Sequence, residues 1–383
     1  MPVILLLDIF ENQLRYNHLL TYNQLVTHMR KLKIQIIVAL LCLVTVAQAQ
    51  TTPPATGQTP RQRPADQVIS NNGLKGNLAA HDPCMIRAGD TYYVLTTGMS
   101  LKSSKDMVNW VNLGSLWDRS TKFSWWNNDI PGNVGLWAPD IHYADGKYHL
   151  YYSVSAWMNF KSSVGYATNV TLDKTSPDYK WVDQGQVVNY KNGGDSVNVI
   201  DPNFFEDVDG KQYLIYGSYK GGLRLIELDP KTGKPNSDKP ELYTITTKLG
   251  EGSYIIKGPE YYYVFASRGK CCSGIQSTYQ IVVGRSKSVK GPYLSKDGKS
   301  WIDNNYTVFL AGNYDEPGRG HNGFFAQGDT TYIVYHAYTR AFNGQSLLNI
   351  KPLFMDKDGW PSLDPHDKLF AMPEFEKKTF LGK

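Results

Sequence analysis

Four ionisable residues stand in matching places of a phrase that the chain repeats. Each lies at or beside the start of a short apolar run, which a turn of the Gly-Asp, Asp-Gly or Gly-Pro type separates from a tyrosine-rich run. The four residues are Asp82, Asp201, Glu251 and His321. If the repeated phrases come together in space, three carboxylates and one imidazole converge on one pocket.

Clustered carboxylates suit acid–base chemistry. Like charges raise one another's pKa, so such a cluster is costly unless its members are hydrogen-bonded or partly protonated. Hydrolysis of a glycosidic bond uses this state: a protonated acid at the leaving oxygen, an ionised base that activates water, and a third carboxylate that keeps the acid's pKa high. Asp82, Asp201 and Glu251 predict these three groups.

The alternative for each carboxylate alone is a structural turn or cap, because Asp-Pro commonly opens turns. Asp229 and Asp364 also precede prolines, and we interpret them as ordinary loop residues. The recurrence of the other three carboxylates in register favours a shared pocket. Asp140 in "WAPDI" lies one position off the register set by the prolines, so we expect it to be structural or to support the pocket from behind.

The repeated phrase predicts a β-hairpin, because apolar and tyrosine-rich runs flank a tight turn. Five copies begin at Asp82, Ala138, Asp201, Glu251 and His321. Their second runs open at intervals of roughly 50 to 70 residues, which suits four-stranded blades with loop insertions. These openings are Tyr92, Tyr148, Tyr213, Tyr262 and Tyr332.

Other strand-like runs lie at 222–229, 280–286 and 349–361, and no long amphipathic helical pattern is present. The chain is therefore predicted to be an all-β protein, a five-bladed β-propeller over residues 71–383. In such a fold the first strand of each blade lines the central channel, which would bring the four ionisable residues together.

The composition is that of a globular protein. Of the 383 residues, 41% are apolar and 13% aromatic, enough for a large core. The formal charge of +5 is spread thinly, without a basic run inside the repeats. This argues against nucleic-acid and membrane-surface binding and favours a neutral partner. We expect a monomer.

The N-terminal segment has the features of an export signal. From Met29, "MRKLKIQIIVALLCLVTVAQAQ" has a basic start, an apolar stretch of about a dozen residues and the small-residue end Ala-Gln-Ala. A membrane anchor is the alternative, but the apolar run is too short for one. We expect a signal peptide at 29–49, a mature, secreted or periplasmic chain from Gln50, and a flexible leader over 50–70. Residues 1–28 are interpreted as a non-native upstream extension.

The cysteines do not predict a disulfide framework. Cys42 lies in the signal, where Leu41 before it argues against a lipoprotein cleavage site, and three cysteines then remain. Cys271 and Cys272 are adjacent, and a bond between neighbours would be strained. We therefore expect two thiols, with a vicinal disulfide as the alternative. The spacing is not that of a zinc site.

Seven phrases that occur in order resemble glycoside hydrolase family 43 over about residues 75–363. They are "HDPCMI" (81–86), "GLWAPDIHY" (135–143), "NVIDPNFF" (198–205), "YGSYKGGL" (216–223), "GEGSYI" (250–255), "KCCSGIQSTYQIVVGRS" (270–286) and "GRGHNGF" (318–324). The sixth phrase is most similar to arabinan endo-1,5-α-L-arabinosidases. The resemblance implies a five-bladed propeller that cleaves α-1,5-linked L-arabinan, a side chain of pectin, with inversion.

The resemblance also implies roles for single residues. The family's general base matches Asp82, its general acid Glu251, and the group that raises the acid's pKa Asp201. Similar enzymes usually have proline after the glycine that follows the acid, where this chain has Ser253. Glu260 in "KGPEYYY" is the other candidate acid, but it belongs to the hairpin turn at the far end of the strand.

The substrate-contacting positions of similar enzymes fall on Asp82, Gly135, Asn198, Ser218, Tyr219 and Lys220. His321 matches a histidine that, with several waters, holds a calcium ion in the axial channel of similar enzymes. Calcium prefers oxygen ligands, so the waters would supply most of its coordination. No organic cofactor is implied.

Four tryptophans gather around the second blade: Trp125, Trp126, Trp137 and Trp157. We expect core packing for most of them, with Trp137 the candidate for stacking on a furanose ring.

Two alternatives remain open. An exo-acting α-L-arabinofuranosidase or β-xylosidase would use the same scaffold, because loops decide between a pocket and an open groove. A non-catalytic carbohydrate-binding propeller would have no need to hold three carboxylates in one pocket.

Overall fold

The computed structural model describes residues 69–117, 123–130, 132, 135–157, 159–194 and 196–382. The predicted upstream extension, signal peptide and all but the end of the leader lie outside these residues. The helical segments of the described part are short: α2 (Ser124–Asp129), α3 (Glu374–Lys377), η1 (Gly274–Gln276), η2 (Trp301–Asp303), η3 (Arg340–Phe342) and η4 (Lys378–Phe380). Within the described residues, no helix has the length and apolar character needed to cross a bilayer.

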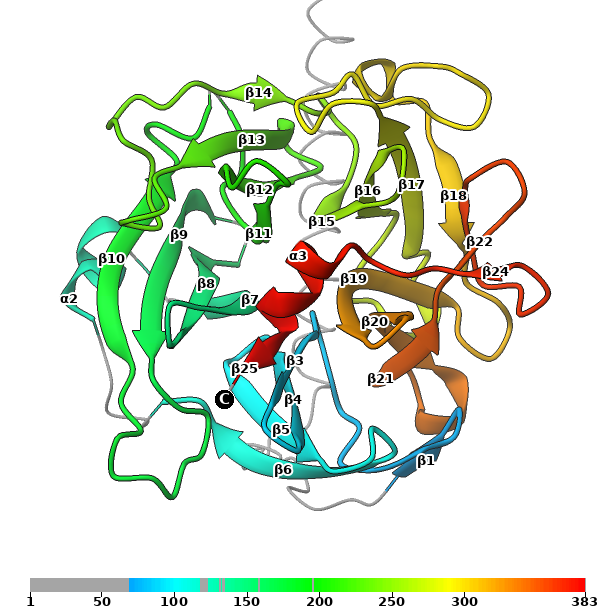
Figure 1. Ribbon diagram of the computed structural model, residues 1–383, viewed down its shortest axis with the longest axis horizontal. Coiled ribbons are helices and arrows are strands. Elements are labelled where there is room, and N and C mark those ends of the chain that lie inside the picture. Colours follow the sequence, from blue (N-terminus) through cyan, green and yellow to red (C-terminus); the bar gives the residue numbers. More distant parts are fainter. Residues whose placement is uncertain are drawn as a thin grey trace, which may run out of the picture. The chain divides into compact units, whose positions relative to one another are not determined.

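Five sheets stand around a common axis, and the innermost strands of each pair in antiparallel fashion, so the protein is a five-bladed β-propeller (Figure 1). The strands nearest the axis are β3 (Cys84–Ala88), β7 (Gly135–Ala144), β11 (Asn203–Glu206), β15 (Glu251–Lys257) and β19 (Gly318–Gln327). The second strands are β4 (Thr91–Thr96), β8 (Lys147–Ala156), β12 (Gln212–Ser218), β16 (Tyr262–Arg268) and β20 (Thr330–Thr339). The predicted fold and its five hairpins are confirmed.

The outer strands complete the blades. The third strands are β5 (Ser100–Ser104), β9 (Asn159–Asn169), β13 (Gly222–Leu228), β17 (Gln280–Ser286) and β21 (Gln345–Pro352). Outside them lie β6 (Asn109–Ser115), β10 (Val182–Asn189), β14 (Tyr243–Thr244) and β18 (Thr307–Leu310). The strand runs predicted at 222–229 and 280–286 are confirmed as β13 and β17.

The run predicted at 349–361 is wrong as a single strand. β21 ends at Pro352, and a separate small sheet follows, formed by β22 (Phe354–Met355), β23 (Pro361–Ser362) and β24 (Lys368–Leu369). Proline has no backbone N–H to donate, which suits the end of a ladder.

The second strands read as continuous apolar runs because they are buried on both faces between neighbouring blades. In β12 every residue after Gln212 is buried. The tyrosines predicted to open these strands lie in β4, β8, β12, β16 and β20.

The two ends of the described chain meet in the ring. Leu78 O accepts the N–H of Leu348 at 2.8 Å, and Ala80 N–H donates to Ser346 O at 3.0 Å, so residues 78–80 act as the outer edge of the fifth blade. β1 (Ile69–Asn71) and β2 (Leu74–Gly76) extend the first sheet, and β25 (Leu381–Gly382) pairs with β3. Figure 1 shows α3 lying over the middle of the ring.

A left-handed residue precedes each innermost strand or lies near its start. The five are Asp82 (φ 53°), Ala138 (φ 44°), Asp201 (φ 57°), Gly252 (φ 56°) and His321 (φ 49°). When the repeats are aligned on these left-handed residues, Glu251 lies one position before the place that Asp82, Asp201 and His321 occupy. Gly252 is required there, because a Cβ would lie 2.9 Å from the His321 ring.

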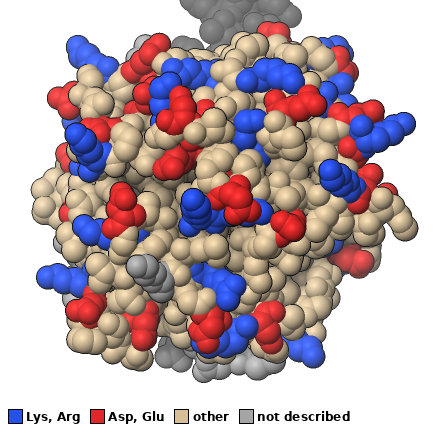
Figure 2. Space-filling model, viewed as in Figure 1, with Lys and Arg blue, Asp and Glu red and all other residues tan. Residues whose placement is uncertain are grey.

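Charged side chains of both signs are interspersed on the face that carries α3 (Figure 2). No single-sign field dominates this face, in line with the small net charge of +5.

Candidate active site

Cross-blade hydrogen bonds fix the left-handed residues. A side chain at the end of one blade's second strand accepts the N–H of the left-handed residue in the next blade. The pairs are Thr97 Oγ1 with Ala138 at 2.9 Å, Ser153 Oγ with Asp201 at 2.8 Å, Ser267 Oγ with His321 at 2.7 Å, and His336 Nδ1 with Asp82 at 3.1 Å. At the remaining junction, Asp201 Oδ2 accepts the N–H of Gly252 at 3.0 Å.

Asp82 is buried among histidines. Its Oδ1 lies 2.9 Å from Nδ1 of His321 and 2.9 Å from Nδ1 of His81, and its Oδ2 accepts from the hydroxyl of Thr97. Burial raises the pKa of Asp82, but His321 and His81 outweigh it and hold this pKa well below its usual range. Asp82 is therefore a carboxylate at neutral pH.

His321 links two of the carboxylates. Its Nδ1 lies 3.9 Å from Oδ2 of Asp201 as well as against Asp82. Burial alone would lower its pKa, but Asp82 and Asp201 raise it to about 9. For Asp201, burial is the main cause and raises its pKa to about 7, although His321 opposes this.

Glu251 has different surroundings. Burial raises its pKa, and the main opposing contact is the Tyr279 hydroxyl, which donates to Oε1 at 2.9 Å. Among the described residues, no ion pair involves Glu251. The cluster thus holds one carboxyl whose pKa is lowered, Asp82, and two whose pKa values are raised, Asp201 and Glu251.

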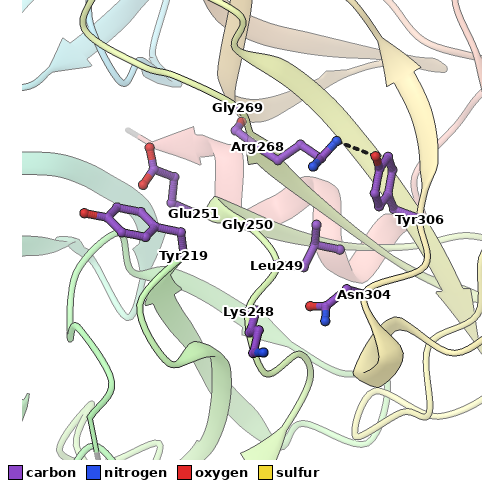
Figure 3. Close-up of a pocket in the computed structure, with 10 residues that line it drawn as sticks. Tyr219, Lys248, Leu249, Gly250, Glu251, Arg268, Gly269, Asn304 and Tyr306 are labelled. Atoms are coloured by element: carbon purple, nitrogen blue, oxygen red, sulfur yellow. Dashed lines mark hydrogen bonds between the residues drawn. The ribbon is translucent and has the colours of Figure 1, made fainter.

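A cavity of about 290 Å³ adjoins Glu251. In Figure 3, Glu251 and Tyr219 lie on one side of it and the Arg268–Tyr306 pair on the other. The Arg268 guanidinium lies 4.2 Å from the Tyr306 ring centroid and donates to its hydroxyl. Tyr219 is 60% exposed, so this side of the cavity is open to a ligand.

The predicted substrate contacts fall into two groups. Tyr219 lines the cavity, and Lys220 Nζ lies 3.5 Å from the ring centroid of Phe160. Asn198 and Ser218 are buried and both bind the backbone of Lys220. Asn198 N–H donates to Lys220 O at 3.1 Å, and Ser218 Oγ accepts from Lys220 N–H at 3.3 Å.

Gly135 begins β7, where a Cβ would lie 2.1 Å from Nε1 of Trp137. The half-buried Trp137 therefore packs on the glycine itself. Trp126 is buried, as expected for core packing, and Trp125 donates to Asp183. Trp157 is 72% exposed, which makes it the least core-like of the four tryptophans.

Asp140 and Glu260 lie where the sequence placed them. Asp140 is buried and accepts from the N–H of Phe204 at 2.7 Å and from Asn203 Nδ2 at 3.2 Å. Burial raises its pKa to about 7. Glu260 is exposed and pairs with Lys287.

The expectation of two thiols at Cys271 and Cys272 is wrong, because these neighbours form a disulfide. Cys272 has a left-handed backbone (φ 59°), and its N–H donates to Tyr338 Oη at 2.8 Å. These local constraints, which no spacing rule shows, hold the pair in the loop between β16 and β17.

Sequence reasoning missed several partners of the cluster: His81, Thr97, Ser153, Ser267, Tyr279 and His336. The position of most of them at the end of a second strand is the signal that could have found them. The repeated phrase is recognised by its first strand, whereas these polar residues belong to the far end of the tyrosine-rich second strand.

The chemistry of His321 and Asn322 bears on the predicted calcium ion. A neutral His321 that donates Nδ1–H to Asp82 keeps a lone pair on Nε2. Both side-chain polar atoms of Asn322, which is 2% exposed, lack a protein partner, so its amide oxygen is available to a cation or to water. One imidazole and one amide oxygen leave most of a calcium shell to water. A cation would have to displace a proton, since the pKa of His321 is raised to about 9.

Comparison with known proteins places the chain in a group of polysaccharide hydrolases. Residues 76–361 match the family described as "Glycosyl hydrolases family 43". The chain is 39% identical over 303 residues to an extracellular exo-α-(1→5)-L-arabinofuranosidase of Cellvibrio japonicus, a match that covers 74% of this chain and 86% of the relative. It is 38% identical over 301 residues to the extracellular endo-α-(1→5)-L-arabinanase 1 of Bacillus subtilis, covering 75% and 88%.

A solved structure shares the fold. The α-L-arabinanase of Cellvibrio cellulosa in complex with arabinohexaose superposes with a TM-score of 0.70 at 35% identity, over 80% of this chain and 99% of that one.

Proposed function

The chain belongs to glycoside hydrolase family 43, and we propose that it cleaves internal α-1,5-L-arabinofuranosidic bonds of arabinan with inversion of configuration. The observation that carries the proposal is the opposite shift of two carboxyl pKa values in one cluster, downward for Asp82 and upward for Glu251. An acid and a base whose pKa values are driven apart are what single-displacement glycoside hydrolysis needs.

In this mechanism Asp82 is the general base. Its carboxylate, ionised at neutral pH, takes a proton from the water that attacks the anomeric carbon. Glu251 is the general acid, and its protonated carboxyl donates to the departing glycosidic oxygen beside the cavity. Asp201 interacts with both through like charge. We assign it the role of raising the pKa of Glu251 when it is ionised.

Inversion requires room for a water between acid and base, which corresponds to a carboxyl separation of roughly 6.5 to 9.5 Å. Proton NMR of the first-formed product from an α-linked substrate should show the β-anomer. Initial release of the α-anomer would mean a covalent intermediate and would remove Asp82 from the role of base.

Endo action is the finer part of the proposal. The exposed Tyr219 at the cavity that adjoins Glu251 is compatible with a chain that continues past the cleavage point. Exo action is the alternative, supported by the 39% identity to an enzyme named as an exo-α-L-arabinofuranosidase. Sizing the early products of linear arabinan separates the two, because endo cleavage gives a spread of oligomers and exo cleavage a single small product.

A calcium ion at His321 would supply a positive charge near the carboxylates and order the channel waters. The residues that would hold it are His321 and Asn322. We expect added calcium to raise the melting temperature of the metal-free protein by mass action and the variant His321→Ala to lose this response. A metal-analysed sample without calcium but with full activity would leave His321 as a partner of Asp82 alone.

Export is proposed from the signal-like segment at 29–49 and from relatives that are named extracellular. N-terminal sequencing of the protein recovered outside the cytoplasm should begin at Gln50. A chain that retains Met29 would contradict cleavage.

A further inference from the structure

The loop between β16 and β17 contacts partners of both catalytic carboxylates, and we propose that its vicinal disulfide Cys271–Cys272 is a positioning group for Asp82 and Glu251. The inference rests on the proposed function, because it concerns the same acid and base.

Tyr338, on β20, is the centre of the contacts on the base side. Its hydroxyl accepts the N–H of Cys272 at 2.8 Å and lies 2.8 Å from Nε2 of His81. Sγ of Cys271 lies 3.4 Å from this hydroxyl, and the two sulfurs lie 3.7 and 3.8 Å from the same imidazole nitrogen. The other nitrogen of His81 is the one 2.9 Å from Asp82. The disulfide therefore touches the ring that touches the base.

Stacking of the same ring limits its movement. The His81 ring stacks on His336 with centroids 4.1 Å apart, and His336 accepts the N–H of Asp82. His81 is thus held by His336 on one face, by Tyr338 at Nε2 and by the two sulfurs beside it. Loss of the sulfur contact removes one of these supports and leaves the others.

The acid side begins at the other end of the loop. Tyr279, which donates to Glu251, directly precedes β17. Ser277 Oγ donates to Lys270 O at 2.7 Å, and Lys270 N–H donates to Thr278 Oγ1 at 2.9 Å, so these bonds close the loop at its base. The disulfide and the tyrosine that donates to the acid therefore belong to one short closed loop.

Reduction is the sharpest perturbation of this arrangement. A dithiol reductant transfers two electrons and two protons to the sulfur pair, which becomes two thiols, and the reductant becomes a cyclic disulfide. Each thiol then regains free rotation about χ1, and the sulfur contact with His81 is no longer fixed. The remaining cysteine of the propeller, Cys84, is buried in β3 and is not expected to exchange.

The test compares three proteins: the full chain before and after dithiothreitol, the double variant Cys271→Ser/Cys272→Ser, and Tyr338→Phe, which keeps the disulfide. We expect the reduced wild type and the double serine variant to lose about tenfold in kcat on linear arabino-oligosaccharides with KM within twofold, since small misplacements of reacting groups cost on the order of 10 to 100-fold. Reoxidation should restore the wild type, and dithiothreitol should not affect the double variant. Tyr338→Phe should fall in kcat without any treatment.

Zinc must be absent during reduction, because Nε2 of His81 and the two sulfurs lie within 4.8 Å of one another and would suit a thiophilic metal once reduced. Melting temperatures are measured on every sample, with kcat assayed well below the lowest of them.

Two results would overturn the inference: a reduced wild type that keeps kcat within twofold, or a Tyr338→Phe variant with full kcat. Failure of the proposed function is distinguishable from these, since no form of the protein would then release products from arabinan.

Discussion

Asp82 and Glu251 belong to the same end of the same propeller, yet their surroundings act on them in opposite directions. Burial raises the pKa of both. At Asp82 two imidazoles lie 2.9 Å from one oxygen and reverse the effect, whereas the Glu251 side chain accepts a hydrogen bond from the Tyr279 phenol. The identity of the neighbours, rather than burial, gives the two carboxyls opposite pKa shifts.

The difference arises at the seam between the fifth and first blades. His321 and His336 come from the fifth blade, and His81 directly precedes the first. At the junction between the third and fourth blades, no hydrogen bond or ion pair of the described residues joins a histidine to Glu251, and Asp201 itself accepts the N–H of Gly252. The repeated fold places these residues at similar positions in their blades. The side chains at each blade junction differ, and they give the carboxyls different pKa values.

The largest expected effect comes from removing either member of the compared pair. Asp82→Asn and Glu251→Gln should each lower kcat by about 10²- to 10⁴-fold, the usual contribution of a general acid or base. Steady-state kinetics and melting temperatures of the purified variants provide the measurement. Glu260→Gln, at an exposed glutamate of the same blade, is the control and should be unchanged. Near-normal kcat in either site variant removes that residue from its role.

His321→Gln should make Asp82 resemble Glu251. Without the imidazole that most lowers it, the pKa of Asp82 rises, so less of the base is ionised at low pH. The acidic limb of the pH profile of kcat/KM should therefore move upward by about one unit, the lower end of what a neighbouring charge does. An acidic limb that stays in place would mean that the base is not Asp82 or that His321 does not set its pKa.

Tyr279→Phe sharpens the comparison from the acid side. The Tyr279 hydrogen bond lowers the pKa of Glu251, so its loss raises that pKa, and the acid keeps its proton to higher pH. The alkaline limb should shift upward while kcat at the optimum falls only several-fold, by analogy with the loss of one hydrogen bond. A downward shift of this limb would contradict the assignment of Glu251 as the acid.

The smallest effect on activity is expected at Glu376, a buried carboxyl on α3. Burial raises its pKa to about 8, so the folded protein holds a proton that the unfolded chain releases near pH 4 to 5. Its contribution favours folding below the unfolded pKa and is lost as pH rises toward 8. Glu376→Gln should weaken the fall of melting temperature between pH 5 and 8 without changing kcat. An identical fall in the variant would show that Glu376 is ionised in the folded state.

Much of this arrangement could be predicted from the sequence. The hairpins follow from local turn and strand chemistry, and the repeat brings Asp82, Asp201, Glu251 and His321 together without any knowledge of contacts. The exact register of Glu251 could not be read from residue types, because it depends on left-handed backbone at Gly252. In three blades a proline directly follows the left-handed residue, at Pro83, Pro139 and Pro202, and this pattern indicates the register. In the other two blades Ser253 and Asn322 take that place, so the pattern is incomplete.

The disulfide and the histidine partners show why the rest escaped prediction. His81 and His336 act through side chains on different blades, and Tyr338 meets Cys272 across 66 positions of sequence. Such contacts depend on how blades are rotated against each other. Neither spacing nor propensity contains that information.

The edge formed by residues 78–80 has a consequence for how activity is acquired. The strand that completes the fifth blade comes from the beginning of the domain, and Asp82 follows it after a single residue. During synthesis all three carboxylates are present before the fifth blade is complete. Asp82 meets His321 only after this last blade has paired with residues 78–80 and docked on the first. An incomplete ring therefore lacks the contact between Asp82 and His321, and we expect activity only once the ring has closed.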